Sequence, residues 1–270
     1  MTLSLVDVLL ASGFVGICLI ISFQGRLQLH RTLLIASART LVQLSFIGLI
    51  LAWIFAQNRW WQVLTVLSIM TLIAAFAAVG RIKHAYQGLL QDTLIALTLG
   101  ACLVTVAAIV LILRISPWYT PQFIIPILGM VLGNALTGVS LTIGSLTQAL
   151  HDERQKINAL LALSASPKEV TIPLVKSAIT TGLTPTTNSM MVVGLVSLPG
   201  MMTGQILAGA DPTQAVRYQI VTMFFICAGS LISCTVVSWL IVRRFFNQQW
   251  QWQAPLAQIS WRKRFKKNKG

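Results

Sequence analysis

Seven stretches of this 270-residue sequence contain no Asp, Glu, Lys or Arg, and each is at least 18 residues long. They cover residues 8–25, 40–58, 60–80, 93–113, 115–150, 177–210 and 218–242. An α-helix needs about 20 apolar residues to cross the ~30 Å hydrocarbon core of a bilayer. Only 10% of the residues are charged, against roughly 25% in soluble domains, and the mean hydropathy is +0.78. The sequence therefore predicts an integral membrane protein.

Each stretch is expected to cross the membrane as a helix, because lipid leaves an unpaired backbone group without a hydrogen-bond partner. The two longest stretches open with proline-containing segments that interrupt a helix, so each is expected to hold one span. The predicted fold is all-α and polytopic, with seven transmembrane helices. These helices are expected near residues 5–23, 33–56, 60–79, 94–113, 123–146, 187–209 and 218–242.

The basic residues fall on one set of connections. Of the 20 Lys and Arg residues, 16 lie in the first, third and fifth connections and after the last predicted span. The positive-inside rule therefore predicts an N-terminus outside and a C-terminus in the cytoplasm. We divide the chain into a transmembrane domain, residues 1–246, and a basic cytoplasmic tail, residues 247–270. The tail mixes Trp with Lys and Arg, so we expect it to contact anionic lipid headgroups and not nucleic acid.

The fifth connection, residues 147–186, is the one long loop and is predicted to face the cytoplasm. Ser166, Pro167 and Glu169 have the spacing of a helix start, with Ser166 as N-cap and Glu169 completing a capping box. We expect a short helix, a turn, and a second helix at the membrane surface that Pro173 bends early. The segment is either a solvated amphipathic connector or a docking element for a soluble partner.

The sequence lacks the patterns of the common catalytic sites. It has no G-x-x-x-x-G-K-[ST] loop for nucleotide phosphates, no zinc-ligand spacing, and no carboxylate pair or Ser/His/Asp set placed for catalysis. We therefore expect no enzyme activity and no cofactor bound by this chain. The ligands of any metal ion stay unknown at this stage.

Polar and soft side chains inside the predicted spans are the candidates for a translocation path. Pro199 and Gly200 should break the sixth predicted helix, and broken helices often line transporter substrate sites. Arg39 can instead extend to the headgroups, and Asp7 is either an interfacial cap or a cation-binding carboxylate. The paired methionines can equally be packing residues. The candidates are Arg39, Gln43, Asn134, Thr137, Asn188, Met201, Met202 and Gln205.

Four segments carry a resemblance to a known family: residues 126–134, 197–205, 208–212 and 215–220, with a weaker match at 38–44. They resemble the FetB-type, or YbbM-like, iron-export permeases of ABC transporters, whose relatives include plant membrane subunits linked to aluminium tolerance. The Leu-Pro-Gly-Met-Met run that starts at Leu198 is the most specific of these matches.

The resemblance implies a membrane subunit that pairs with a separate ATP-binding cassette subunit and works as a homodimer of such pairs. The long fifth connection is then the coupling element. It is loosely similar to the coupling motif of ABC importers, with Asn158 and Ser164 where that motif has Glu and Gly. The candidate coupling residues are Asp152, Glu153, Arg154, Asn158, Ser164, Ser166, Lys168 and Glu169.

The function that the resemblance implies is export of metal ions, iron first, across the inner (plasma) membrane, with ATP hydrolysed on the partner subunit. Two other classes stay open from the residues alone. One is a stand-alone secondary transporter or channel that uses Asp7 and Arg39 as coupling charges. The other is a membrane scaffold that binds a soluble ATPase without transporting anything.

Overall fold

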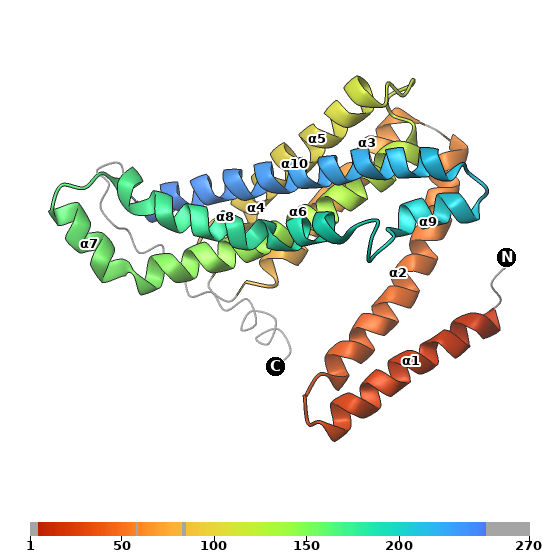
Figure 1. The fold of residues 1–270 in the computed structure, drawn as a ribbon, viewed down its shortest axis with the longest axis horizontal. Helices are drawn as coiled ribbons and strands as arrows, with labels where there is room; N and C mark the ends of the chain where they lie inside the picture. Colours follow the sequence, from red (N-terminus) through yellow and green to blue (C-terminus); the bar gives the residue numbers. More distant parts are fainter. Residues whose placement is uncertain (1–4, 58, 83–84, 247–270) are drawn as a thin grey trace. The chain divides into compact units, whose positions relative to one another are not determined.

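The computed structural model describes residues 5–57, 59–82 and 85–246, and these form helices joined by turns, with no strand among them (Figure 1). The predicted all-α class is confirmed. The tail, residues 247–270, lies outside the described residues. The contacts divide the chain into two units, residues 1–58 and 59–270, which are described separately.

The first unit is a helical hairpin of α1 (Leu5–Gln24) and α2 (His30–Gln57). Its turn is tight: Arg26 and Gln28 have φ angles of 50° and 56°, and the backbone N–H of Leu29 donates to the Ser22 hydroxyl over 3.2 Å. Many apolar side chains on both helices are exposed, as expected of surfaces that face lipid.

The second unit is a bundle built around α6 (Pro121–Asp152), which packs against α3 (Trp60–Val79), α8 (Pro167–Val192) and α10 (Pro212–Phe245). Residues 89–112 form one helical run with two π-helical turns, which packs mainly on α10. The run comprises α4 (Leu89–Leu97), η1 (Thr98–Cys102), α5 (Leu103–Ala107) and η2 (Ala108–Ile112). Two short helices, α7 (Arg154–Ala162) and α9 (Gly200–Leu207), lie at opposite ends of the bundle (Figure 1).

Glycines bring the central helices into close contact. A Cβ on Gly182 of α8 would lie 2.7 Å from the carbonyl oxygen of Gly138 on α6, and a Cβ on Gly100 would lie 2.7 Å from that of Gly229 on α10. Real Cβ atoms do not come this close to backbone, so only glycine permits these two crossings. Small residues at contacts of this kind let membrane helices approach closely.

Within the described residues, five helices are long and apolar enough to cross a bilayer: His30–Gln57, Trp60–Val79, Leu89–Ile112, Pro121–Asp152 and Pro212–Phe245. They coincide with five of the seven predicted spans, and the third matches its predicted range of 60–79 at both ends. The first predicted span corresponds to α1, whose described apolar part, Leu10–Gln24, is shorter. The count of seven and the orientation of the termini stay predictions.

The expected break at Pro199 and Gly200 in the sixth predicted span, residues 187–209, is confirmed, but the helix before the break starts at Pro167 and not near residue 187. Helix α8 ends at Val192, and the chain then turns at Gly194, which has a φ angle of 84° and donates its N–H to the Ser197 carbonyl over 2.9 Å. Helix α9 starts only after Pro199. The predicted loop 147–186 is also largely helical, because α8 begins at Pro167 and continues through Pro173 and Pro185.

Candidate functional site

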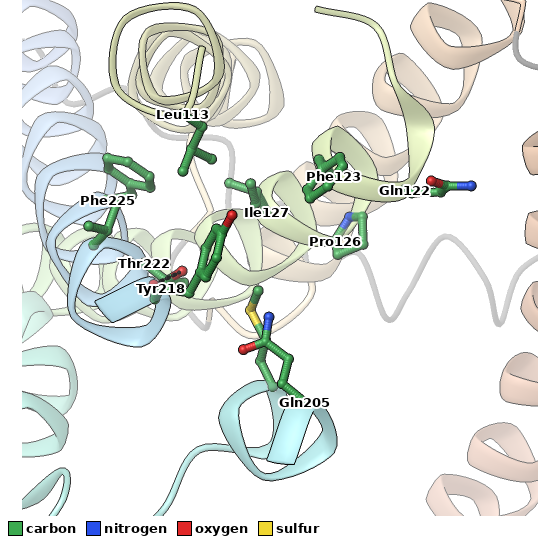
Figure 2. A pocket seen from close by; sticks show the side chains of 11 residues that line it. Leu113, Gln122, Phe123, Pro126, Ile127, Gln205, Tyr218, Thr222 and Phe225 are labelled. Atoms are coloured by element: carbon green, nitrogen blue, oxygen red, sulfur yellow. Dashed lines mark hydrogen bonds between the residues drawn. The ribbon is translucent and has the colours of Figure 1, made fainter. Parts of the chain in front are cut away.

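A cavity of about 170 Å³ lies at the α9 end of the bundle (Figure 2). Helix α9 contributes Met201 and Gln205 to its wall, and the first turns of α10 contribute Tyr218, Thr222 and Phe225. The other lining residues come from the end of the 89–112 run, the start of α6 and α10. They are Leu113, Gln122, Phe123, Pro126, Ile127 and Val221. The break between α8 and α9 positions this wall, because it lets α9 pack back against α10.

The cavity is mostly apolar but contains one polar group that lacks a partner. The side-chain carbonyl oxygen of Gln205 is buried and accepts no hydrogen bond within the described residues. A buried amide oxygen of this kind costs about 1–3 kcal/mol unless a bound water or ligand donates to it. The Thr222 hydroxyl is already committed, since it donates to the Tyr218 carbonyl over 2.8 Å. No residue with a formal charge lines this space, so it suits an uncharged donor better than a bare metal ion.

The structure brings only two of the eight predicted path residues together, Met201 and Gln205. Met202 is 9% exposed and is a packing residue, whereas Asn188 is exposed on α8. Within α6, the Asn134 amide donates to the Met130 carbonyl over 2.9 Å.

The other three predicted path residues are not among the residues that line this cavity. The Thr137 hydroxyl on α6 donates to the Gly133 carbonyl over 3.1 Å, so it is bonded within its own helix. Arg39 and Gln43 are exposed on α2 of the first unit. No group of three or more His, Cys, Asp or Glu side chains gathers anywhere in the described ranges.

The predicted coupling residues lie on a helical hairpin at the other end of the bundle, formed by the end of α6, α7 and the start of α8. The predicted capping box is confirmed: the Glu169 N–H donates to the Ser166 hydroxyl over 3.3 Å, and the Ser166 N–H donates to the Glu169 carboxylate over 2.7 Å. These bonds hold the pKa of Glu169 below its usual value, with the backbone bond as the largest cause.

The hairpin presents both charges and an exposed apolar tip. Glu153 pairs with Lys156 over 2.9 Å, and Asp152 accepts from Gln148 over 2.9 Å. A groove of about 350 Å³ runs between α7 and α8, with Ile157 and Val170 at its apolar floor. At the tip, Leu163 is 79% exposed. The remaining predicted coupling residues, Arg154, Asn158, Ser164 and Lys168, are also exposed on this hairpin.

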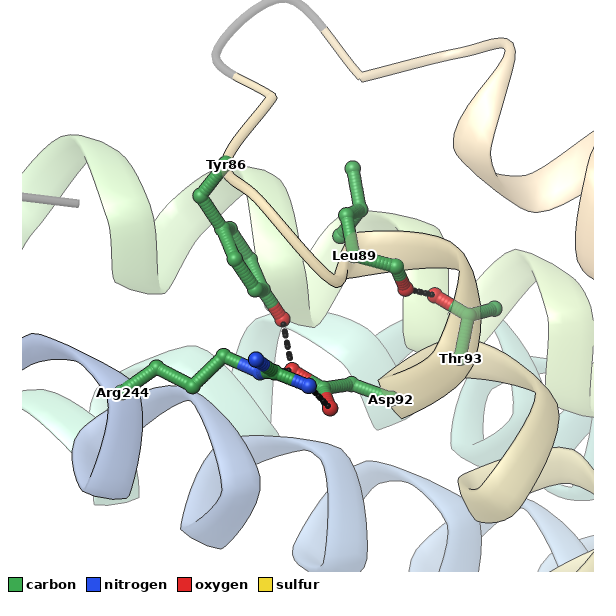
Figure 3. Close-up of polar contacts among 5 residues, drawn as sticks. All are labelled: Tyr86, Leu89, Asp92, Thr93 and Arg244. Carbon is green, nitrogen blue, oxygen red and sulfur yellow. Dashed lines mark hydrogen bonds and ion pairs between the residues drawn. The ribbon is translucent and has the colours of Figure 1, made fainter. Parts of the chain in front are cut away.

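Sequence reasoning missed a buried charge cluster that joins α4 to the end of α10 (Figure 3). Asp92 is 1% exposed, and its carboxylate accepts from Arg244 Nε over 2.5 Å and Nη2 over 2.8 Å. The Tyr86 hydroxyl donates to the same carboxylate over 2.9 Å. Burial, and then the negative charge of Asp92, raise the pKa of Tyr86 well above 10. The guanidinium lies against Gly88, where a side chain would overlap it.

The sequence holds one signal for this cluster. Asp92 immediately precedes the predicted span 94–113, and Arg244 follows the predicted span 218–242. The predicted topology puts both ends at the same membrane face, so an acidic and a basic residue are available there to pair. Because Asp92 and Arg244 are separated by 152 positions, no local sequence pattern indicates that they pair.

The long apolar helices and their exposed apolar side chains define a multi-pass helical membrane protein. A family model described as "Uncharacterised protein family (UPF0014)" matches residues 5–246. The chain belongs to this family, and the resemblance to FetB-type permeases is confirmed.

Several relatives match most of the chain. The UPF0014 membrane protein slr1647 of Synechocystis is 39% identical over 88% of this chain and 92% of its own length. The probable iron export permease protein FetB of Escherichia coli is 36% identical over 90% of this chain and 92% of its own. Protein ALUMINUM SENSITIVE 3 of Arabidopsis thaliana is 34% identical over 88% and 85%. No solved structure matches the chain.

Proposed function

We propose that this chain is the membrane-spanning permease subunit of an ABC-type transporter that exports metal ions, iron first, across the inner (plasma) membrane. The observation that carries the proposal is the 36% identity, over 90% of the chain, to a relative named a probable iron export permease. The name of the Arabidopsis relative refers to aluminium, which favours a metal cargo over an organic one. ATP is hydrolysed on a separate subunit, because this sequence has no phosphate-binding loop.

The α7–α8 hairpin is the proposed docking element for the ATPase, and a second copy of the chain completes the transporter. Two features of the hairpin support this role. Its capping box holds the start of α8 in a defined geometry, and its tip exposes Leu163 to solvent. An exposed leucine beside charged residues on a projecting hairpin is suited to insert into a groove of a soluble partner.

The partner is tested by purifying the tagged full chain from its native membrane in mild detergent. The wild-type chain is expected to retain a P-loop ATPase in near-equal amount, and Leu163→Asp to lose it. Leu207→Asp is the matched control, because Leu207 is 80% exposed at the opposite end of the bundle. A well-folded wild-type chain that retains no ATPase would refute the ABC assignment.

The cargo and the direction are tested in inside-out membrane vesicles that contain chain and ATPase. Export predicts uptake of ferrous iron into these vesicles on addition of ATP, and no uptake with a non-hydrolysable analogue. Uptake that follows an ion gradient without ATP, and that is lost in Arg39→Gln, would instead indicate a secondary transporter. Binding of the ATPase without any flux would indicate a scaffold.

A further inference from the structure

Between Ser177 and Asn188, helix α8 has an exposed face made mostly of polar side chains. These residues, named here the polar stripe, recur every three or four positions and therefore share one side of the helix. The polar stripe consists of Ser177, Thr180, Thr181, Thr184, Thr187 and Asn188, all of them exposed. The opposite side of α8 is buried against α6 and α10 through residues such as Leu174, Ala178 and Gly182.

The polar stripe lies at the depth of the bilayer core. Gly182, in the middle of the stripe, contacts Gly138, which lies near the middle of the spanning helix α6. It also lies beside Cys234, which is well inside the spanning helix α10. At about 1.5 Å per residue, Ser177 and Asn188 are within about 9 Å of Gly182 along the helix axis. The hydrocarbon core extends about 15 Å to either side of its midplane, so the whole stripe falls inside it.

The neighbouring spanning helix shows what a lipid-facing surface of this protein looks like. Between Ile220 and Trp239, the large side chains that α10 exposes are apolar: Ile220, Phe224, Leu231, Ile232 and Trp239. The stripe on α8 has no such residue between Ser177 and Asn188. Polar side chains at this depth normally face the protein interior or a water-filled space, because lipid cannot replace their hydrogen bonds to water. A continuous run of such side chains therefore suits contact with water better than contact with lipid.

The hydroxyl groups of the stripe already donate their protons within α8, and this limits the solutes that they can bind. The hydroxyl of Thr180 donates to the Lys176 carbonyl over 2.9 Å, and that of Thr184 to the Thr180 carbonyl over 2.8 Å. Thr181 and Thr187 donate in the same way to carbonyls on the preceding turn. Each hydroxyl has one proton and two lone pairs, so these oxygens can only accept hydrogen bonds from outside the helix.

We infer that the polar stripe of α8 lines a water-filled path for a hydrated cation. The water molecules around a cation turn their hydrogens outward, and a row of accepting oxygens about one turn apart complements that shell. The stripe has no carboxylate to compensate a stripped multivalent ion, so the ion keeps its water. Lys176 lies at the α7 end of the same face, where its long side chain can extend toward the headgroups. The inference rests on the proposed function only in taking this cation as the cargo.

The test is the reaction of single cysteines with charged thiol reagents in membranes. Thr184→Cys and Thr180→Cys are made after the four native cysteines are replaced by serine, and both changes fit an exposed position. Leu231→Cys on α10 is the matched control, because Leu231 is 43% exposed at nearly the same depth. Thiolates form in water and not in hydrocarbon, so a cationic methanethiosulfonate should label both stripe cysteines at least about tenfold faster than the control.

Two results would overturn the inference. Stripe cysteines that react no faster than Leu231→Cys would place the face against lipid or dry protein. An anionic methanethiosulfonate that reacts as fast as the cationic one would remove the preference for cations. The labelling needs neither ATP nor the partner, so it can succeed where ATPase co-purification fails, and fail where co-purification succeeds.

Discussion

Removing Arg244 should destabilise the fold more than removing Asp92, although the two residues form one ion pair. The Asp92 side chain is 2% exposed, whereas that of Arg244 is 37% exposed and can turn toward water. Arg244→Gln leaves a buried carboxylate with Tyr86 as its one strong donor, and breaking a buried pair in this way costs about 3–5 kcal/mol. Asp92→Asn leaves a guanidinium that can be rehydrated, so we expect about 2 kcal/mol, the range of hydrogen bonds to charged groups.

Thermal unfolding of the intact chain in detergent, followed by tryptophan fluorescence, measures this difference. With about 2–4 °C per kcal/mol for a domain of this size, Arg244→Gln should lower the Tm by at least about 6 °C. The double variant Asp92→Asn/Arg244→Gln should be more stable than Arg244→Gln alone, because it removes the stranded charge. Arg243→Gln is the control: its guanidinium stacks 3.8 Å from the Trp239 ring centroid, a contact typically contributing about 0.5–1 kcal/mol. An Asp92→Asn variant as damaged as Arg244→Gln would refute the reasoning.

Three further predictions concern packing and pH. Gly182→Ala should prevent the close crossing of α6 and α8 and lower the yield of folded protein on size-exclusion chromatography, whereas Gly144→Ala, with no atom within 4 Å of the new Cβ, should not. The raised pKa of Tyr86 stabilises the fold below its ordinary value of 10, so stability should fall above that pH in wild type and this component should be absent in Tyr86→Phe. The lowered pKa of Glu169 stabilises the fold above its ordinary value of 4.5. Acid should therefore increase hydrogen exchange at the start of α8 in wild type but not in Glu169→Gln.

Local signals explain the parts of the fold that could be predicted. Charge-free runs gave the positions of the five spanning helices, because desolvation of charge is the strongest single constraint on a helix in lipid. The capping box at Ser166 depends on residues three apart, so the sequence alone was sufficient to place the start of α8.

The break between α8 and α9 shows where local signals were not sufficient. Pro199 and Gly200 were recognised as helix breakers, but the broken helix was expected to start near residue 187. The helix starts 20 residues earlier, at Pro167, because a polar face does not prevent helix formation when the other face packs on α6. The cavity around Gln205 forms because α9 turns back and packs against α10. No residue spacing in the sequence predicts this turn.

The Asp92 cluster and the polar stripe of α8 differ in how many of their hydrogen-bonding groups are already used within the chain. The Asp92 carboxylate is buried and accepts three hydrogen bonds from Arg244 and Tyr86, so its partners lie within the chain. The hydroxyls of Thr180 and Thr184 are exposed, and their protons are committed while their lone pairs are not. A carboxylate bonded within the chain stabilises one arrangement of helices, whereas the remaining lone pairs of the threonine oxygens are available to a donor from outside. The first arrangement therefore points to structure, and the second to the passage of a hydrated solute.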